Sequence, residues 1–384
     1  MQVYLDNSAT TQCSAAAAAA VSCLLLEDYG NPSSLHQKGT DAEKHVKAAA
    51  AVIAKTLHCR EKEIVFTSGG TESNNLAIIG SAMANQRSGK HIITTCMEHP
   101  SVMQAMLFLK SCGYELTILP ADQNGVLTEH VLEESLRPDT ILVSMMMVNN
   151  EIGAVLPIAE SAKMIHEKSP AALFHVDAVQ AYGKYRINPK KLGVDLLSAS
   201  GHKIHGPKGV GFLYIREKAK IRPIAFGGGQ QNGLRSGTMN APGIAGLGAA
   251  AAECYTDFEG KMDRLRENKN RFVQQLLCLE DVKLNGPTGP DSAPHIVNAS
   301  FLGVRSEVLL HALEDKGISV SAGSACSSAH PAEEGTLPAL GYSRSRRDSA
   351  LRFSFSTQTT QEELDYTAQT LRQLLPVLRR YTRK

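Results

Sequence analysis

The sequence predicts an α/β fold with a mostly parallel sheet, followed by a second, smaller α+β domain. Short apolar runs alternate with helix-like stretches over residues 63–215, and near-continuous apolar strands are typical of parallel sheets covered by helices. After about residue 255 the strands become shorter and the helices more polar. We therefore expect a large domain over residues 14–255 and a small domain formed by residues 1–13 and 256–384.

The expected elements follow from the apolar pattern and from the turn residues between its segments. A short strand and a turn open the chain at 3–11, and the segment 63–85 gives a strand, a glycine loop and a helix. The other expected helices cover residues 14–28, about 40–57, 101–113, 128–137, 158–169, 262–277 and 307–317. The other expected strands lie within residues 90–99, 114–120, 140–150, 171–178, 194–197, 210–215, 295–301, 318–325 and 351–356.

The composition is that of a globular protein without a strong overall charge. Of 384 residues, 43% are hydrophobic and 20% charged, and the formal net charge is +2, which does not favour nucleic acid or a membrane surface. The apolar stretch 14–26 follows Asp6 without any Lys or Arg, so we interpret it as a buried helix and not as a signal peptide. No apolar segment reaches the roughly 20 residues that span a bilayer. We expect a cytoplasmic protein.

The cysteines give no sign of a metal or disulfide framework. There are eight, and none forms a CxxC pair or a zinc-like spacing. Disulfides are not expected in a chain of this length without a secretory signal. We expect no resident metal.

Polar side chains gather where the predicted strands end. In open α/β sheets, ligands bind at the carboxyl ends of the strands. The residues at these positions are Thr71, His99, Asn150, Asp177, His202 and Lys203.

The stretch "TSGGTESNN" leads from a strand through Gly69 and Gly70 into a helix. The first N–H groups of a helix and its dipole attract anions, so this turn could hold a phosphate. A plain glycine turn with Thr71 as the N-cap explains it equally well. The stretch matches neither a Walker loop nor a GxGxxG turn, which disfavours nucleotide binding.

Two strand ends carry charged residues that each have two possible roles. Asp177 ends the strand "ALFHVD", either as a cap for the next segment or as the partner of a cationic ring nitrogen. Lys203, in "SGHKIHGPKG", is either a solvated loop residue or a lysine able to form a Schiff base. His99 alone suggests a hydrogen-bonded core histidine. Together with a phosphate loop, these residues are the parts that hold pyridoxal phosphate.

Cys326 lies in "SVSAGSACSSAH", where small neighbours cannot pack a core around it. An accessible thiol near positive charge is a candidate nucleophile, whereas the other seven cysteines are expected to be inert. Arg352, in "LRFSFS", could grip a carboxylate through two hydrogen bonds or form a surface ion pair.

The chain resembles the NifS- and IscS-like cysteine desulfurases of the class V aminotransferase family. The shared motifs run nearly end to end: "YLDNSATT", "GNPSS", "EIVFTSGGTESNN", "EHPSV", "VNNEIG", "HVDAVQ", "SGHKIHGPKG", "RSGT" and "GSACSS". The resemblance implies the pyridoxal-phosphate transferase fold of type I, with seven strands in the large sheet.

The resemblance also implies roles for individual residues. Lys203 would hold pyridoxal 5'-phosphate covalently, Asp177 would pair with its ring nitrogen, and His99 would stack on the ring and take part in proton transfer. Gln180 would bind the phenolic oxygen, and Thr238 would reach the phosphate of the neighbouring subunit in a homodimer. The remaining positions are Gly70, Thr71, Ser200 and His202 for the phosphate, Asn150 and Arg352 for the substrate, and Cys326 as the nucleophile.

The implied activity is the conversion of L-cysteine to L-alanine, with the sulfur carried as a persulfide on Cys326. An acceptor protein for iron–sulfur clusters or tRNA thiolation would receive it, and Cys326 would contact a nascent cluster only transiently. Selenocysteine lysis or β-elimination, a catalytically inactive scaffold and a nucleotide-binding enzyme are the alternatives.

Some positions depart from the family pattern. Gly70 replaces a common alanine, Met147 a common histidine, and Pro100 and Ser101 follow His99 in place of commoner pairs. The chain ends without the longer tail of close relatives, which leaves the sulfur acceptor open.

Overall fold

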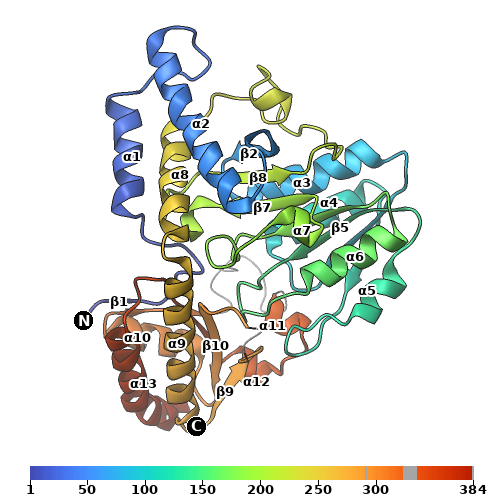
Figure 1. The fold of residues 1–384 in the computed structure, drawn as a ribbon. Coiled ribbons are helices and arrows are strands. Elements are labelled where there is room, and N and C mark those ends of the chain that lie inside the picture. Colours follow the sequence, from blue (N-terminus) through green and yellow to red (C-terminus); the bar gives the residue numbers. More distant parts are fainter. Residues whose placement is uncertain (290–291, 323–334, 383–384) are drawn as a thin grey trace.

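The computed structural model describes residues 1–289, 292–322 and 335–382. Its centre is a seven-stranded sheet with the strand order β2-β8-β7-β6-β5-β3-β4 (Figure 1). The strands are β2 (Ile64–Thr67), β3 (His91–Thr95), β4 (Glu115–Leu119), β5 (Thr140–Met146), β6 (Leu173–Asp177), β7 (Leu196–Ser200) and β8 (Gly211–Ile215).

The seven-stranded sheet is mostly parallel, which confirms the predicted fold class. Only β8 runs antiparallel to its neighbours, β2 and β7. Its side chains alternate between the two faces: Phe212 and Tyr214 join one hydrophobic core, and Leu213 and Ile215 the other. Both faces are therefore covered, as a parallel sheet requires.

Helices form the two covering layers. On one face, α3 (Gly70–Asn85) and α4 (Pro100–Ser111) pack against the sheet. The other core takes side chains from α1, α2, α6 and α8, with α1 and α2 lying along α8 (Figure 1). The bounds of the other helices in this part are α1 (Ala15–Leu26), α2 (Gln37–Leu57), α5 (Glu129–Ser135), α6 (Ile158–Lys168), α7 (Pro189–Leu192) and α8 (Ala241–Tyr255).

A second, antiparallel sheet has its own hydrophobic core. Its strand order is β12-β13-β10-β9, and a separate short pair joins β1 to β11 in parallel. The strands are β1 (Val3–Tyr4), β9 (Val282–Asn285), β10 (Ile296–Phe301), β11 (Ile318–Ser319), β12 (Ser321–Ala322) and β13 (Ala350–Ser354). The helices are α9 (Phe258–Leu277), α10 (Ser306–Glu314), α11 (Thr336–Ala339), α12 (Arg344–Arg347) and α13 (Gln361–Thr382).

The elements differ from the predicted ones mainly at their ends. The strand expected over 140–150 ends at Met146, and the one expected over 318–325 is split into β11 and β12 before the described residues stop. The helices α8 and α13 and the strand β9 were not predicted. The division into two domains with the stated boundaries remains a prediction. In the described part of the chain, no helix is both long and apolar enough to cross a membrane.

Phe272 of α9 supports the second core, where its ring meets Phe353 and Phe355 edge-on at centroid distances of 5.2 and 5.7 Å. We expect Phe272→Ala to lower the free energy of unfolding by about 3–5 kcal/mol, because it leaves a cavity at a fully buried site. Urea denaturation followed by circular dichroism measures this loss. Phe108→Ala, at a half-exposed position of α4, is the control and should change stability by only about 0.5 kcal/mol. Equal midpoints for the two variants would contradict the prediction.

Candidate functional site

The polar residues predicted at the strand ends meet at the carboxyl edge of the seven-stranded sheet. β6 ends at Asp177, and β7 ends at Ser200, where a short 3₁₀ turn, η2 (Gly201–Lys203), carries Lys203. A cavity of about 390 Å³ opens beside them. Its lining includes Ala9, Thr10, Gly69, Gly70, Thr71, Ser200 and His202.

The glycine loop forms a cup at the start of α3. The helix begins at Gly70 with Gly69 as its N-cap, so the alternative that made Thr71 the N-cap is wrong. Gly69 has φ +148°, and a side chain on Gly70 would come within 2.7 Å of Val179 Cγ2, so both positions favour glycine. The Ser200 hydroxyl is buried there without a partner among the described residues.

Asp177 presents a carboxylate that is almost fully buried, at 5% exposure. Its Oδ1 accepts a hydrogen bond from the Val179 N–H at 2.9 Å, and its Oδ2 accepts one from Asn74 Nδ2 at 2.8 Å. These bonds orient the carboxylate without neutralising it. A buried carboxylate is costly unless a cation pairs with it.

Asn74 links Asp177 to His99 through Ser101. The second hydrogen of Asn74 Nδ2 goes to Ser101 Oγ at 2.9 Å, so the Ser101 hydroxyl is left to donate its proton to His99 Nδ1 at 2.8 Å. The Ser101 N–H also donates to Nδ1, at 3.1 Å. Because Nδ1 accepts two hydrogen bonds, the neutral ring carries its proton on Nε2.

Electrostatics show that His99, Asp177 and Lys203 share one site. Burial lowers the pKa of His99, the Asp177 carboxylate acts in the opposite direction, and the Lys203 ammonium lowers it further. Burial also lowers the pKa of His202, to about 4, with Lys203 the next cause. Both histidines are therefore neutral at pH 7, and His202 Nδ1 lies 3.2 Å from Thr10 Oγ1.

The N-terminal turn supplies the partners of Lys203. Lys203 Nζ donates to the Ala9 carbonyl at 2.8 Å and to the Ser8 carbonyl, and Gln180 Nε2 donates to the same Ser8 carbonyl at 2.9 Å. From the other side, Lys184 Nζ donates to the Lys203 carbonyl at 2.9 Å. Burial lowers the pKa of Lys184 to about 8.

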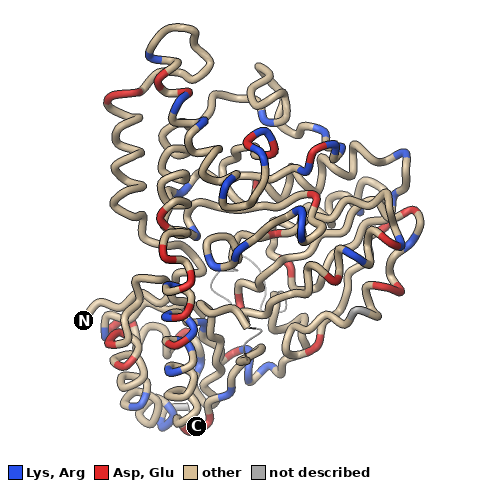
Figure 2. The backbone as a smooth tube through the Cα atoms, in the orientation of Figure 1, with Lys and Arg blue, Asp and Glu red and all other residues tan. Residues whose placement is uncertain are grey.

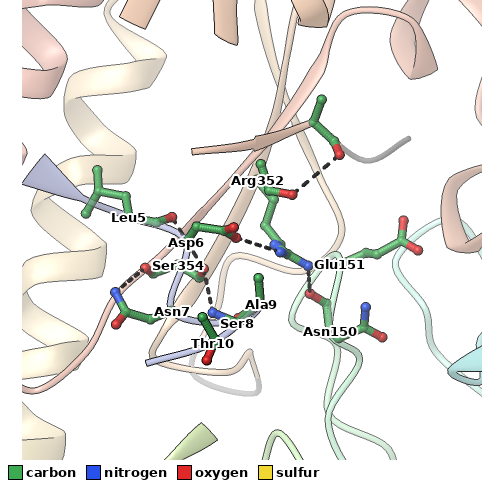
Figure 3. Close-up of polar contacts among 12 residues, drawn as sticks. Leu5, Asp6, Asn7, Ser8, Ala9, Thr10, Asn150, Glu151, Arg352 and Ser354 are labelled. Carbon is green, nitrogen blue, oxygen red and sulfur yellow. Dashed lines mark hydrogen bonds and ion pairs between the residues drawn. The ribbon is translucent and has the colours of Figure 1, made fainter. Parts of the chain in front are cut away.

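Arg352, from β13, reaches the same region from the second sheet. Its Nη2 donates to Asp6 Oδ1 at 2.8 Å and its Nη1 to the Asn150 carbonyl at 3.0 Å (Figure 3). The guanidinium is 5% exposed, and its Nε has no partner within the described part of the chain. The prediction of a surface ion pair is therefore wrong: the pair is real, but it is buried.

Four predicted site residues line this cavity: Gly70, Thr71, Ser200 and His202. The contacts described above involve six more, which are Lys203, Asp177, His99, Gln180, Asn150 and Arg352. Two are in neither group. Thr238 is exposed on the loop before α8 and is not one of the described residues that line it. Its predicted contact with a neighbouring subunit stays a prediction. Cys326 lies outside the described residues.

Residue-by-residue reasoning overlooked several supporting groups. Glu98 is partly buried, and the burial of its carboxyl raises the pKa of that group to about 8, with the Asp177 charge contributing. Its Oε1 accepts from Thr95 Oγ1 at 2.6 Å and from the Met146 N–H at 2.9 Å. The only sequence feature that could have pointed to Asn74, Ser101 and Asp6 is their place within the motifs shared with the family.

Comparison with known proteins agrees with this geometry. The class V aminotransferase family model matches residues 3–367. The cysteine desulfurase IscS of Dictyoglomus turgidum is 42% identical over 379 residues, covering 98% of this chain and 95% of the relative. A NifS-like protein of known structure superposes with a TM-score of 0.92 at 36% identity, covering 98% of this chain and all of that chain.

A further solved structure, described as SspA in complex with cysteine, superposes with a TM-score of 0.80 at 30% identity, covering 94% of this chain and all of that chain. The family model spans nearly the whole sequence, and the relatives match in length as well as in fold. This chain therefore belongs to the class V aminotransferase family of pyridoxal-phosphate-dependent enzymes.

Proposed function

We propose that this protein is a cysteine desulfurase, which converts L-cysteine to L-alanine and carries the sulfur as a persulfide on Cys326. The observation that carries the proposal is the meeting of Lys203, Asp177 and His99 beside an anion cup, with the buried Arg352 close by. The similarity to IscS and to a structure bound to cysteine supports the substrate.

The residues present fit pyridoxal 5'-phosphate. A phosphate at the start of α3 would meet four suitable groups. They are the Ser200 hydroxyl, which has no partner among the described residues, the N–H of Gly70, and the side chains of Thr71 and His202. Lys203 would hold the cofactor, Asp177 would pair with its ring nitrogen and Gln180 would bind its phenolic oxygen. When bound, the cofactor supplies an electron sink for breaking bonds at the substrate Cα.

The chain's own groups would then position the substrate and move its protons. Arg352, with Asn150 beside it, binds the cysteine carboxylate through two parallel hydrogen bonds. The Lys203 amine takes the Cα proton, and the neutral His99 has a proton available on Nε2. Lys184 holds the backbone of Lys203 from the other side.

Sulfur transfer is assigned to Cys326. Its thiolate attacks the substrate sulfur, a sulfur–sulfur bond forms, the carbon–sulfur bond breaks and alanine leaves. We further propose a cytoplasmic homodimer in which Thr238 completes the neighbouring site, and a sulfur-acceptor protein for iron–sulfur clusters or tRNA thiolation. The large and small domains, divided near residue 255, would enclose the substrate.

The direct test is turnover of L-cysteine by the purified holoenzyme with a reductant. We expect equal amounts of alanine and sulfide, and none with Lys203→Ala, because that variant lacks the amine that takes the Cα proton. Cys326→Ala should keep the cofactor absorbance and lose alanine formation. Pyruvate in place of alanine would identify β-elimination instead, and undiminished alanine formation by Cys326→Ala would exclude the persulfide.

Replacing Ser101 tests the orientation of His99. Ser101→Ala removes a hydrogen bond to Nδ1 that stabilises the neutral ring, so the pKa of His99 should rise from its lowered value. The acid limb of the kcat/KM profile should move to higher pH, with a loss in rate smaller than the ~10²-fold that acid–base catalysis supplies. Ser111→Ala, on the exposed end of the same helix, is the control and should leave the profile unchanged. An unshifted limb in Ser101→Ala would contradict the assigned proton position.

Arg352→Lys tests the binding of the substrate carboxylate. An ammonium group cannot form the two parallel hydrogen bonds of a guanidinium, and losing a charged hydrogen bond costs about 1.5–3 kcal/mol. We expect KM for L-cysteine to rise roughly 10- to 100-fold, as measured by steady-state alanine formation. Arg344→Lys, at the exposed start of α12, should leave KM unaltered. The assignment fails if the two variants have the same KM.

A further inference from the structure

A cluster of three different metal-binding side chains lies on elements that do not line the cofactor cavity. Cys23 comes from α1, Asp28 follows the end of that helix, and His45 comes from α2. Their Sγ, carboxylate oxygen and ring nitrogen all lie within 4.8 Å of one another. The spacing of 23, 28 and 45 matches no zinc motif, so the residue pattern alone does not indicate the cluster.

The backbone at the end of α1 builds one side of the cluster. The N–H groups of Glu27 and Asp28 both donate to the Cys23 carbonyl, at 2.8 and 3.1 Å. This turn folds Asp28 back over the helix end, beside the Cys23 side chain. Since α1 and α2 both pack along α8, His45 is brought to the same point from the second helix.

The His45 ring is already oriented by its neighbour. His45 Nε2 lies 2.8 Å from Asp28 Oδ2, and the two side chains are 37% and 30% exposed. A bound ion would replace the contact between His45 and Asp28, because both atoms would turn toward the ion. Tetrahedral ligands about 2.0–2.3 Å from a zinc ion lie roughly 3.5 Å apart, which is farther than the 2.8 Å between these two atoms. The side-chain movements needed are on the order of 1 Å.

The end of α1 carries two carboxylates, and Lys38 and Lys44 lie nearby on α2. Along α1 itself the sequence has no charged residue, and the tube in Figure 2 turns red where the helix ends, at Glu27 and Asp28. The carboxylates of Glu27 and Asp28 would stabilise a divalent ion bound beside them.

We propose that Cys23, Asp28 and His45 form a binding site for a divalent zinc-like ion, with the fourth position open to water. A mixed set of sulfur, nitrogen and oxygen ligands suits Zn²⁺, whereas Ca²⁺ and Mg²⁺ prefer oxygen alone. The ion would clamp the end of α1 to α2 and so fix the intervening loop, residues 27–36. The site is structural and takes no part in cysteine turnover.

Equilibrium dialysis of the chelator-treated holoenzyme against Zn²⁺, with a thiol-free reductant, tests the proposal. Metal analysis should find one more zinc per chain in the unaltered protein than in Cys23→Ala. Co²⁺ should give a thiolate charge-transfer absorption that is present in the former and missing from the latter. Zn²⁺ should also raise the unfolding temperature of the unaltered protein and not that of Cys23→Ala.

His45→Gln provides a second variant that keeps the thiol, and Cys112→Ser replaces an exposed cysteine on another helix. We expect His45→Gln to lose the additional zinc and Cys112→Ser to retain it. Cofactor absorbance and circular dichroism verify that each variant is folded. Equal zinc in the unaltered protein and Cys23→Ala overturns the proposal, as does loss of the additional zinc in Cys112→Ser.

Discussion

The burial of the Asp177 carboxylate at the end of β6 is the constraint on which the rest of the site depends. A carboxylate at 5% exposure must be held by donors and matched by positive charge. Val179 and Asn74 provide the donors, and the geometry of Asn74 then determines what Ser101 can do. The hydrogen bonds run from the Asp177 carboxylate through Asn74 and Ser101 to His99. They fix the ring proton of His99 on Nε2.

The N-terminal segment connects the two sheets through the same site. Its first residues pair with β11, Asp6 holds Arg352 (Figure 3), and the carbonyls of Ser8 and Ala9 accept from Lys203. The segment 3–11, predicted as a short strand and a turn, therefore lines the cavity through Ala9 and Thr10. Lys203 and Arg352 both contact this segment, through Ala9 and Asp6.

The sequence was sufficient for the fold class and for the expectation of a polar edge to the sheet, whereas the roles of the site residues stay predictions. Apolar strands followed by polar residues such as Asp177 and Lys203 predicted a parallel sheet with a polar edge, because the alternation of apolar runs depends only on local pattern. The roles of Asn74 and Asp6 could not be predicted, because each acts through a contact with a residue far away in the chain. Ser101 contacts His99 only two residues away, but its proton is directed there by the distant Asn74. Thr71 was a reasonable N-cap by residue type, but Gly69 takes that place because the tight turn needs its positive φ.

The contact between Asp6 and Arg352 joins residues 346 positions apart. The ribosome synthesises Asp6 long before Arg352, so their contact can form only after the later residue has emerged. The seven-stranded sheet, complete by residue 215, can already fold by then. Closing so long a loop is slow, so we expect the contact between the N-terminal turn and the second sheet to form late in assembly.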